Sequence, residues 1–382
     1  MNLTAEPLNL LRTRTSSKWA RYDTDVLPLP VAEMDYPLAP EITAALHAAI
    51  DRGDTGYNPG STSVARAFAG FAERHWGWSI DQANIKVTGD VAMGIVELLR
   101  MVTKPGDPVV ICPPIYPPFF ILTTEAGCAT AEVPLLGSIA DGWALDFAGI
   151  EAAFAAGARA ILLCSPHNPV GRVWARAELA ELAELAERYD AWIIADEIHA
   201  PITFSDAEFV PILSVSDAAR EHAFSVTSAS KSFNLAGLKC AHMVAGSARG
   251  KAVLDALPLE VEWRAGLFGA IANTVAFTEC DEWLAAALAA IDTNRRVLGE
   301  LLASQLPQAH YRQPQASYLA WVNLSDCGFE ENPAARALAE AKVAFGIGPD
   351  FGAAGAHHIR VNLACSPEML TEAITRFAAL PR

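Results

Sequence analysis

The sequence predicts an α/β fold in which a mainly parallel sheet is flanked by helices. Short apolar runs bounded by Gly, Pro and Asp alternate with alanine-rich stretches of helical spacing. This alternation is typical of parallel strands joined by crossover helices. The chain has 382 residues, of which 52% are hydrophobic and 19% charged, so it can bury a large core, and its length suggests two domains.

Four of the apolar runs are predicted to be buried strands, and helices are expected between them. The strands cover residues 84–88, 107–111, 158–163 and 191–195. The helices lie at about residues 91–104, 147–156 and 176–189. Candidate functional residues follow the strand ends, at the edge where open α/β sheets bind their ligands. They are the segment 89–92, Tyr116, Asn168 and Asp196.

Composition excludes several classes of partner. A net charge of -16, with no patch of clustered Lys and Arg, argues against nucleic acid and anionic membranes, which would repel the protein. The first residues lack the basic start and apolar run of a signal peptide, and no stretch reaches the ~20 apolar residues of a membrane span. We therefore expect a cytoplasmic protein.

The cysteines predict neither a disulfide framework nor a metal site. Seven are widely spaced, at positions 112, 128, 164, 240, 280, 327 and 365. Their odd number and their place in apolar runs favour reduced thiols, several of them buried. No pair has CxxC spacing, and the adjacent His357 and His358 cannot make a metal site without further ligands. We expect no metal.

Three polar residues appear in an order that pyridoxal phosphate (PLP) chemistry can use. PLP needs an amine to hold its aldehyde, an anion to keep its ring nitrogen protonated and a donor for its ring oxygen. Lys231, Asp196 and Asn168 can supply these. Each alone has a simpler interpretation, as a surface lysine, a helix cap and a turn. Ser228 and Lys239, on either side of Lys231, make the cofactor interpretation the better one.

On these residues the chain resembles the fold-type I PLP-dependent enzymes of aminotransferase class I/II, over essentially its whole length. The resemblance implies that Lys231 is the Schiff-base lysine, with Asp196 on the ring nitrogen and Asn168 on the ring oxygen. Ser228 and Lys239 are similar to the serine and the cation that bind the phosphate. The implied fold is a large domain with a mainly parallel seven-stranded sheet and a smaller α+β domain.

Further residues take their roles from the same resemblance. Tyr116 is similar to the aromatic residue that stacks on the ring, and Arg360 to the arginine that grips the substrate α-carboxylate, a task suited to its planar fork. The turn at residues 89–92 can be a plain strand-to-helix turn or a phosphate loop. The resemblance favours the loop and assigns the backbone amides of Val91 and Ala92 to the phosphate.

Several sequence blocks resemble a narrower group, the MalY/PatB-type cystathionine β-lyases, which are carbon-sulfur lyases. His199 matters most, because many aminotransferases carry Tyr at this cofactor position. The resemblance implies β-elimination from L-cystathionine or related cysteine S-conjugates, giving a thiol, pyruvate and ammonia. The blocks are SKW at 17–19, LPVAEMD at 29–35, GY at 56–57, PIYPP at 114–118, DEIH at 196–199 and SKSFNLAG at 230–237.

Two other functions stay open on the sequence alone. An aminotransferase would use the same cofactor residues but return a proton to the cofactor carbon instead of expelling a leaving group. A regulatory protein that binds another protein would be free to lose Lys231 or Asp196, and both are present. The sequence therefore predicts an enzyme, with the lyase ahead of the aminotransferase.

The resemblance also predicts domains and assembly. Residues 47–282 are expected to form the large PLP-binding domain, and residues 1–46 with 283–382 the small domain and an N-terminal arm. Tyr57 is similar to a tyrosine that reaches the phosphate of the neighbouring subunit. This implies a homodimer with composite active sites, acting on a small amino-acid substrate.

Overall fold

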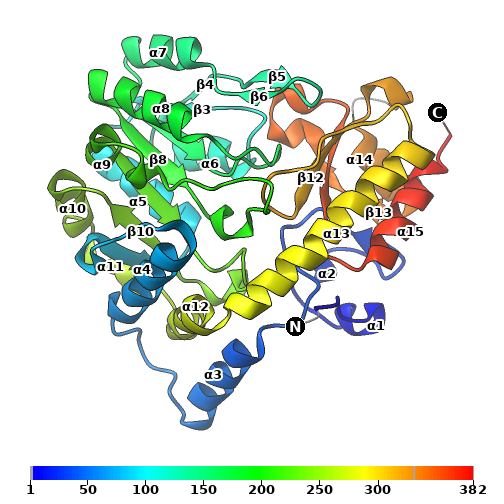
Figure 1. Cartoon of the computed structure of the whole chain (residues 1–382), viewed down its shortest axis with the longest axis horizontal. Helices are drawn as coiled ribbons and strands as arrows, with labels where there is room; N and C mark the ends of the chain where they lie inside the picture. The colour runs from blue at the N-terminus through cyan, green and yellow to red at the C-terminus, as the bar shows by residue number, and fades with distance from the viewer. Residues whose placement is uncertain (1–2, 330–331, 382) are drawn as a thin grey trace.

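The computed structural model describes residues 3–329 and 332–381, and its centre is a seven-stranded sheet. The strand order is β2-β10-β9-β8-β7-β3-β4 (Figure 1). Pairing is parallel from β9 to β4, whereas β10 runs antiparallel to both of its neighbours. The strands are β2 (Ile85–Thr88), β3 (Pro108–Ile111), β4 (Ala129–Glu132), β7 (Ala160–Cys164), β8 (Trp192–Asp196), β9 (Ala223–Thr227) and β10 (Ala241–Ala245). The predicted fold class is confirmed.

The predicted elements are found close to their expected limits. Strands β2, β3, β7 and β8 correspond to the four predicted strands. The three predicted helices are α5 (Val91–Val102), α7 (Phe147–Ala155) and α8 (Arg176–Arg188). Other helices around this sheet are α4 (Thr62–Trp76), α6 (Pro118–Glu125), α9 (Asp217–His222), α10 (Ala248–Asp255), α11 (Leu259–Trp263) and α12 (Leu267–Glu279).

The sheet separates two apolar cores, as the alternation of side chains along β7 shows. Ala160 and Leu162 pack in the core that includes α5 and α6. Ile161 and Leu163 point to the opposite face, into the core that includes α8. Since successive side chains of a strand face opposite sides, a strand buried on both faces reads as one continuous apolar run. This explains why the strands were visible in the sequence.

A second, four-stranded antiparallel sheet lies beside the first, with order β11-β12-β15-β14. Its strands are β11 (His310–Tyr311), β12 (Leu319–Asn323), β14 (Gly346–Ile347) and β15 (His358–Asn362). The long helix α13 (Asp281–Gln305) runs from the first sheet to this one and packs on α15 (Pro367–Ala378) (Figure 1). Smaller elements here are α14 (Pro333–Arg336), β1 (Leu27–Pro28) paired with β13 (Val343–Ala344), and the hairpin β5 (Leu136–Ser138) with β6 (Gly142–Ala144).

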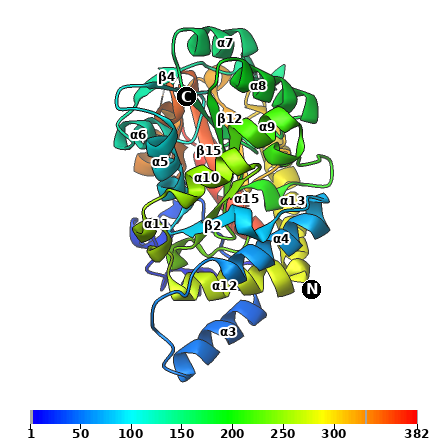
Figure 2. The same cartoon turned by 90° about the vertical axis from the view of Figure 1, so that its left-hand side faces the viewer.

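The N-terminal part contributes α1 (Leu8–Leu11), α2 (Ser17–Ala20) and α3 (Pro40–Asp51). Helix α3 packs on α12, and its far end projects from the body of the molecule (Figures 1 and 2). The predicted domain limits at residues 46/47 and 282/283 fall inside α3 and α13. The division into two domains therefore stays a prediction.

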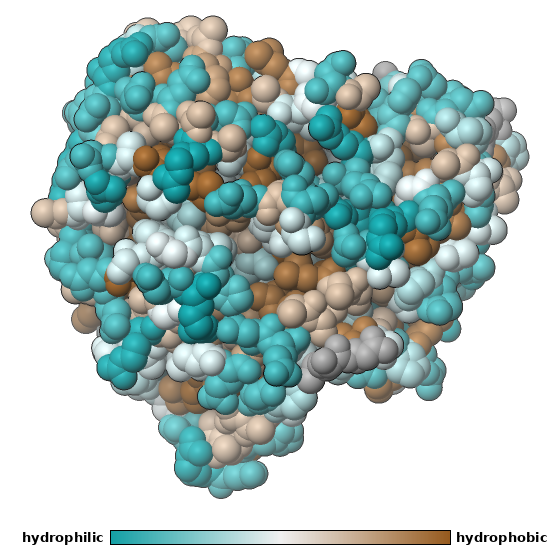
Figure 3. Space-filling model, viewed as in Figure 1, coloured by the Kyte–Doolittle hydropathy of each residue, from teal (hydrophilic) through white to brown (hydrophobic). Residues whose placement is uncertain are grey.

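The buried cysteines, the helix lengths and the surface hydropathy agree with the expectations from composition. All seven cysteines are buried, which agrees with the prediction that several of the thiols lie in the core. Within the described part of the chain, no helix is both long and apolar enough to cross a membrane. On the face shown in Figure 3, hydrophilic residues cover most of the outer elements, and hydrophobic residues gather towards the middle.

Candidate active site

A cavity of about 660 Å³ lies at the carboxyl ends of the central strands. The N-terminal segment and the β14–β15 end of the smaller sheet close its other sides. Of the predicted site residues, only Tyr57 lies outside its lining. Those that line it are Val91, Ala92, Tyr116, Asn168, Asp196, His199, Ser228, Lys231, Lys239 and Arg360.

Lys231 follows β9 and reaches into the cavity from the large sheet. Its Nζ donates a hydrogen bond to the Ala32 carbonyl oxygen at 3.0 Å. The lysine pKa is lowered to about 8, chiefly by burial and also by the nearby Arg360 cation, whereas Glu33 and Asp196 act in the opposite direction. A lysine with this pKa is partly neutral near neutral pH, so it can act as a nucleophile or as a base.

Asp196 is the last residue of β8 and lies buried below the same cavity. Its pKa is raised to about 6 because burial outweighs the opposite effects of the Ile198 backbone N–H and the Lys231 charge. Its Oδ1 accepts the Ile198 N–H at 3.1 Å. A buried carboxylate is stabilised most strongly by a cation placed directly against it. This position suits the protonated nitrogen of a ring.

Asn168 and Arg360 are joined across the cavity. Arg360 Nη1 donates to Asn168 Oδ1 at 3.1 Å, and Nη2 donates to the Pro30 carbonyl oxygen at 2.7 Å. The guanidinium also lies over the Phe351 ring, 4.9 Å from its centroid. Burial lowers the arginine pKa to about 10, which leaves it charged at neutral pH. Its buried Nε has no hydrogen-bond partner among the described residues, so a donor remains for an anionic ligand.

The amino end of α5 forms the anion-binding end of the cavity. Asp90 caps the helix: its Oδ1 accepts the Met93 N–H at 2.8 Å, and its Oδ2 accepts from Lys239 Nζ at 2.9 Å. The N–H groups of Val91 and Ala92 lie in the first turn, where a helix offers no carbonyl partner. An anion bound here would meet these two donors, the helix dipole and the Lys239 cation.

Ser228 lies beside this end with its hydroxyl already engaged. Its Oγ donates to the Cys240 carbonyl oxygen at 2.7 Å and accepts the Ser230 N–H at 3.0 Å. To donate to a phosphate, the hydroxyl would have to turn away from that carbonyl. Its predicted phosphate contact stays a prediction.

Tyr116 and His199 contribute rings to the cavity. Burial raises the pKa of Tyr116, and the Arg360 cation lowers it. Burial lowers the pKa of His199 to about 3, so its ring is neutral near neutral pH. The buried Nδ1 of His199 has no partner in the described structure, which leaves one polar atom for a ligand.

Tyr57 is separate from the cavity of its own chain. It follows α3, is 83% exposed, and packs edge-on against Trp263 with ring centroids 5.4 Å apart. An exposed tyrosine on a projecting segment can reach a neighbouring molecule. The predicted contact with the partner subunit's phosphate stays untested.

Sequence reasoning missed the N-terminal side of the cavity. Ser17, Arg21 and Tyr22 line it from the region of α2, together with residues 30–32. The Ala32 carbonyl oxygen accepts hydrogen bonds from both Lys231 and the Tyr318 hydroxyl. The sequence blocks at 17–19 and 29–35 were recognised. Nothing in their own residues indicated that they lie against Lys231, which is about 200 residues further along the chain.

Comparisons with known proteins agree with this geometry. A family model described as Aminotransferase class I and II matches residues 24–377. The chain belongs to this family. A Mycobacterium leprae protein, named provisionally as a cystathionine beta-lyase, is 41% identical over 98% of each chain. The cystathionine beta-lyase of Corynebacterium glutamicum is 32% identical, again over 98% of both.

A solved structure has the same fold over nearly the whole length of both chains. It is a Corynebacterium diphtheriae protein named provisionally as a PLP-dependent beta-cystathionase. The TM-score is 0.94 with 33% identity, covering 99% of this chain and 98% of that chain. The predicted family is confirmed, and the names of these relatives agree with the predicted lyase subgroup.

Proposed function

We propose that the protein is a PLP-dependent carbon-sulfur β-lyase that cleaves L-cystathionine or related cysteine S-conjugates. The observation that carries the proposal is one cavity that brings Lys231, Asp196, Asn168 and Arg360 together. Relatives named cystathionine beta-lyase cover 98% of the chain. The products would be a thiol, pyruvate and ammonia.

The donor set of the cavity fits PLP at each of its functional groups. Lys231 offers the amine for the aldehyde, and the buried Asp196 offers the anion for the ring nitrogen. The free Nδ1 of His199 and the amide of Asn168 are polar groups for the ring side. Lys239 and the first turn of α5 would receive the phosphate. The cofactor's charges would thus meet complementary groups.

When bound, PLP would supply an electron sink for the bonding pair released at the substrate Cα. Arg360 holds the substrate carboxylate and so orients the Cα–H bond. Lys231, freed as an amine, removes the Cα proton, and its lowered pKa keeps a useful neutral fraction. The Ala32 carbonyl holds the Nζ atom in place through one of its protons. Asp196 supports the charge on the ring nitrogen.

We also propose that the enzyme is a cytoplasmic homodimer with composite sites. The exposure of Tyr57 on the segment after α3 supports a contact with a second copy. The odd number of widely spaced, buried cysteines fits a reducing compartment.

The test is to supply L-cystathionine without any keto acid and to measure thiol and pyruvate over many turnovers. We expect sustained release of both in equal amounts. An aminotransferase would stop after about one turnover and would resume only when a keto acid is added. That result would contradict the lyase proposal and would identify the protein as an aminotransferase.

A further inference from the structure

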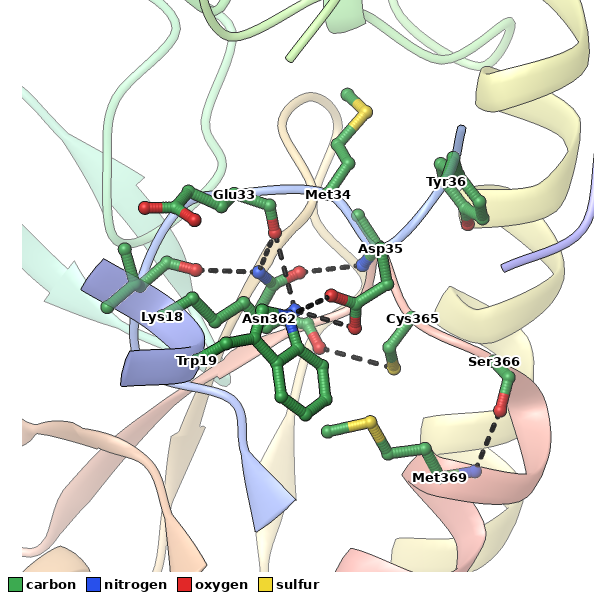
Figure 4. Close-up of polar contacts among 12 residues, drawn as sticks. Lys18, Trp19, Glu33, Met34, Asp35, Tyr36, Asn362, Cys365, Ser366 and Met369 are labelled. Atoms are coloured by element: carbon green, nitrogen blue, oxygen red, sulfur yellow. Dashed lines mark hydrogen bonds and ion pairs between the residues drawn. The ribbon is translucent and has the colours of Figure 1, made fainter. Parts of the chain in front are cut away.

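Helix α2 forms a fixed wall of the cavity. Two of its residues, Lys18 and Trp19, are buried and point towards Asp35 (Figure 4). Ser17 and the C-cap residue Arg21 line the cavity instead. Residues four apart on a helix share a face, so the turn presents one face to the protein and one to the cavity.

The inner face of α2 is anchored by a fully buried ion pair. Lys18 Nζ lies 2.7 Å from Asp35 Oδ2, and both side chains are 0% exposed. Trp19 Nε1 donates to the other oxygen of Asp35 at 3.0 Å. Lys18 also donates to the Glu33 carbonyl oxygen at 3.4 Å. Breaking a buried pair leaves an uncompensated charge, so these contacts hold the turn firmly.

The same segment is tied to the strand that carries Arg360. Asn362, two residues further along β15, donates through Nδ2 to the carbonyl oxygen of Glu33 at 2.7 Å (Figure 4). The same Nδ2 donates to the carbonyl oxygen of Val31 at 2.7 Å. Arg360 itself donates to Pro30. These contacts fix the position of α2, with its C-cap residue Arg21, relative to β15, which carries Arg360, and both arginines line the same cavity.

The charges that line the cavity divide into two groups. Five of them have the partners described above: Lys231, Lys239, Arg360, Asp90 and Asp196. Arg21 and Asp350, by contrast, have no side-chain hydrogen bond or ion pair within residues 3–329 and 332–381. Asp350 lies in the turn Gly348–Phe351 and directly precedes Phe351, whose ring lies under the Arg360 guanidinium. One unpaired cation and one unpaired anion thus face the same cavity.

We propose that Arg21 and Asp350 form a subsite for the half of the substrate that leaves with sulfur. Arg21 would bind a carboxylate on that half, and Asp350 an ammonium group. The preferred substrates are then cysteine thioethers whose departing half carries its own carboxylate. L-cystathionine carries both charged groups there. This inference rests on the proposed lyase function and narrows its substrates to thioethers whose departing half is charged.

The test compares three thioethers in the holoenzyme and its Arg21→Gln variant. S-ethyl-L-cysteine has no distal charge, S-carboxyethyl-L-cysteine has the carboxylate alone, and L-cystathionine has carboxylate and ammonium. We expect Arg21→Gln to raise KM about tenfold for the two carboxylate substrates, the loss of one charged hydrogen bond in a partly exposed site. KM for S-ethyl-L-cysteine and all three kcat values should stay unchanged.

Asp350→Asn separates the two halves of the proposed subsite. It should raise KM for L-cystathionine alone, because only this substrate carries the distal ammonium. Arg12→Gln is the matched control, since Arg12 is an exposed arginine at the end of α1 and does not line the cavity. It should leave all three substrates unaffected.

A binding measurement provides a readout that does not depend on turnover. Borohydride reduction fixes PLP to Lys231, and calorimetry on this inactive protein then reports the Kd of L-cystathionine. Arg21→Gln should weaken that Kd by the same factor as KM. Equal changes for charged and uncharged thioethers, or no change for any, would overturn the subsite. If the unmodified enzyme released no pyruvate from any thioether, the lyase proposal itself would fail.

Discussion

The two sides of the cavity are built in different ways. On the large-sheet side, Asp196 ends strand β8, Lys231 follows β9, and Val91 opens helix α5, so each is placed by a strand or helix. On the N-terminal side, residues 30–35 have no comparable element and are held by contacts from distant parts of the chain. Asn234 pairs with the backbone of Met34, and Asn362 binds two carbonyls of the segment. In the proposed mechanism the first side would supply the catalytic groups, and the second would help to hold the substrate.

Replacing Lys231 by Ala tests the large-sheet side alone. The N-terminal side should remain folded, but the amine that holds PLP and moves the Cα proton is lost. We expect pyruvate release to fall by at least about a thousandfold. Lys251→Ala, which removes an exposed lysine on α10, is the control. Activity of Lys231→Ala near that of the unmodified enzyme would refute the assignment.

Replacing Lys18 by Met tests the N-terminal side alone. Asp35 would be left as a buried charge without its cation, and the free energy of unfolding should fall by about 3–5 kcal/mol. Urea denaturation measures this change. Lys251→Met removes the corresponding lysine from the exposed Lys251–Asp255 pair and should cost no more than about 0.5 kcal/mol. Equal effects of the two variants would show that the anchor is unimportant.

Arg360 belongs to both sides, because it bonds Asn168 on one and Pro30 on the other. Arg360→Lys keeps the charge but loses the planar fork. We expect kcat/KM to fall by about tenfold to a hundredfold for every thioether, charged or not. If kcat/KM fell only for substrates with a distal carboxylate, Arg360 would bind the leaving group and not the α-carboxylate.

Tyr57 should produce the smallest effect, since it would add one contact from a second subunit. Tyr57→Phe is expected to weaken PLP retention by about tenfold, the effect of one hydrogen bond to a charged group. Dialysis followed by cofactor absorbance measures the retained fraction. Unchanged retention would remove Tyr57 from the composite site.

The two sides of the cavity also differ in how well the sequence predicts them. Buried parallel strands are continuous apolar runs, so the central sheet and the residues after β7 and β8 could be predicted. The role of Ala32 could not, because its backbone oxygen acts and no side chain signals it. The burial of Lys18 in an ion pair could not be predicted either, because a lysine in a polar stretch normally lies in solvent. Such contacts depend on tertiary structure.

The most direct test of the lyase follows the cofactor itself. The holoenzyme is mixed with excess L-cystathionine and no keto acid, and the absorbance of Lys231-bound PLP is recorded until the substrate is consumed. β-Elimination regenerates this form in each cycle, so we expect its absorbance to return completely at the end. Permanent conversion to the pyridoxamine form after one turnover, reversed only by a keto acid, would contradict the lyase.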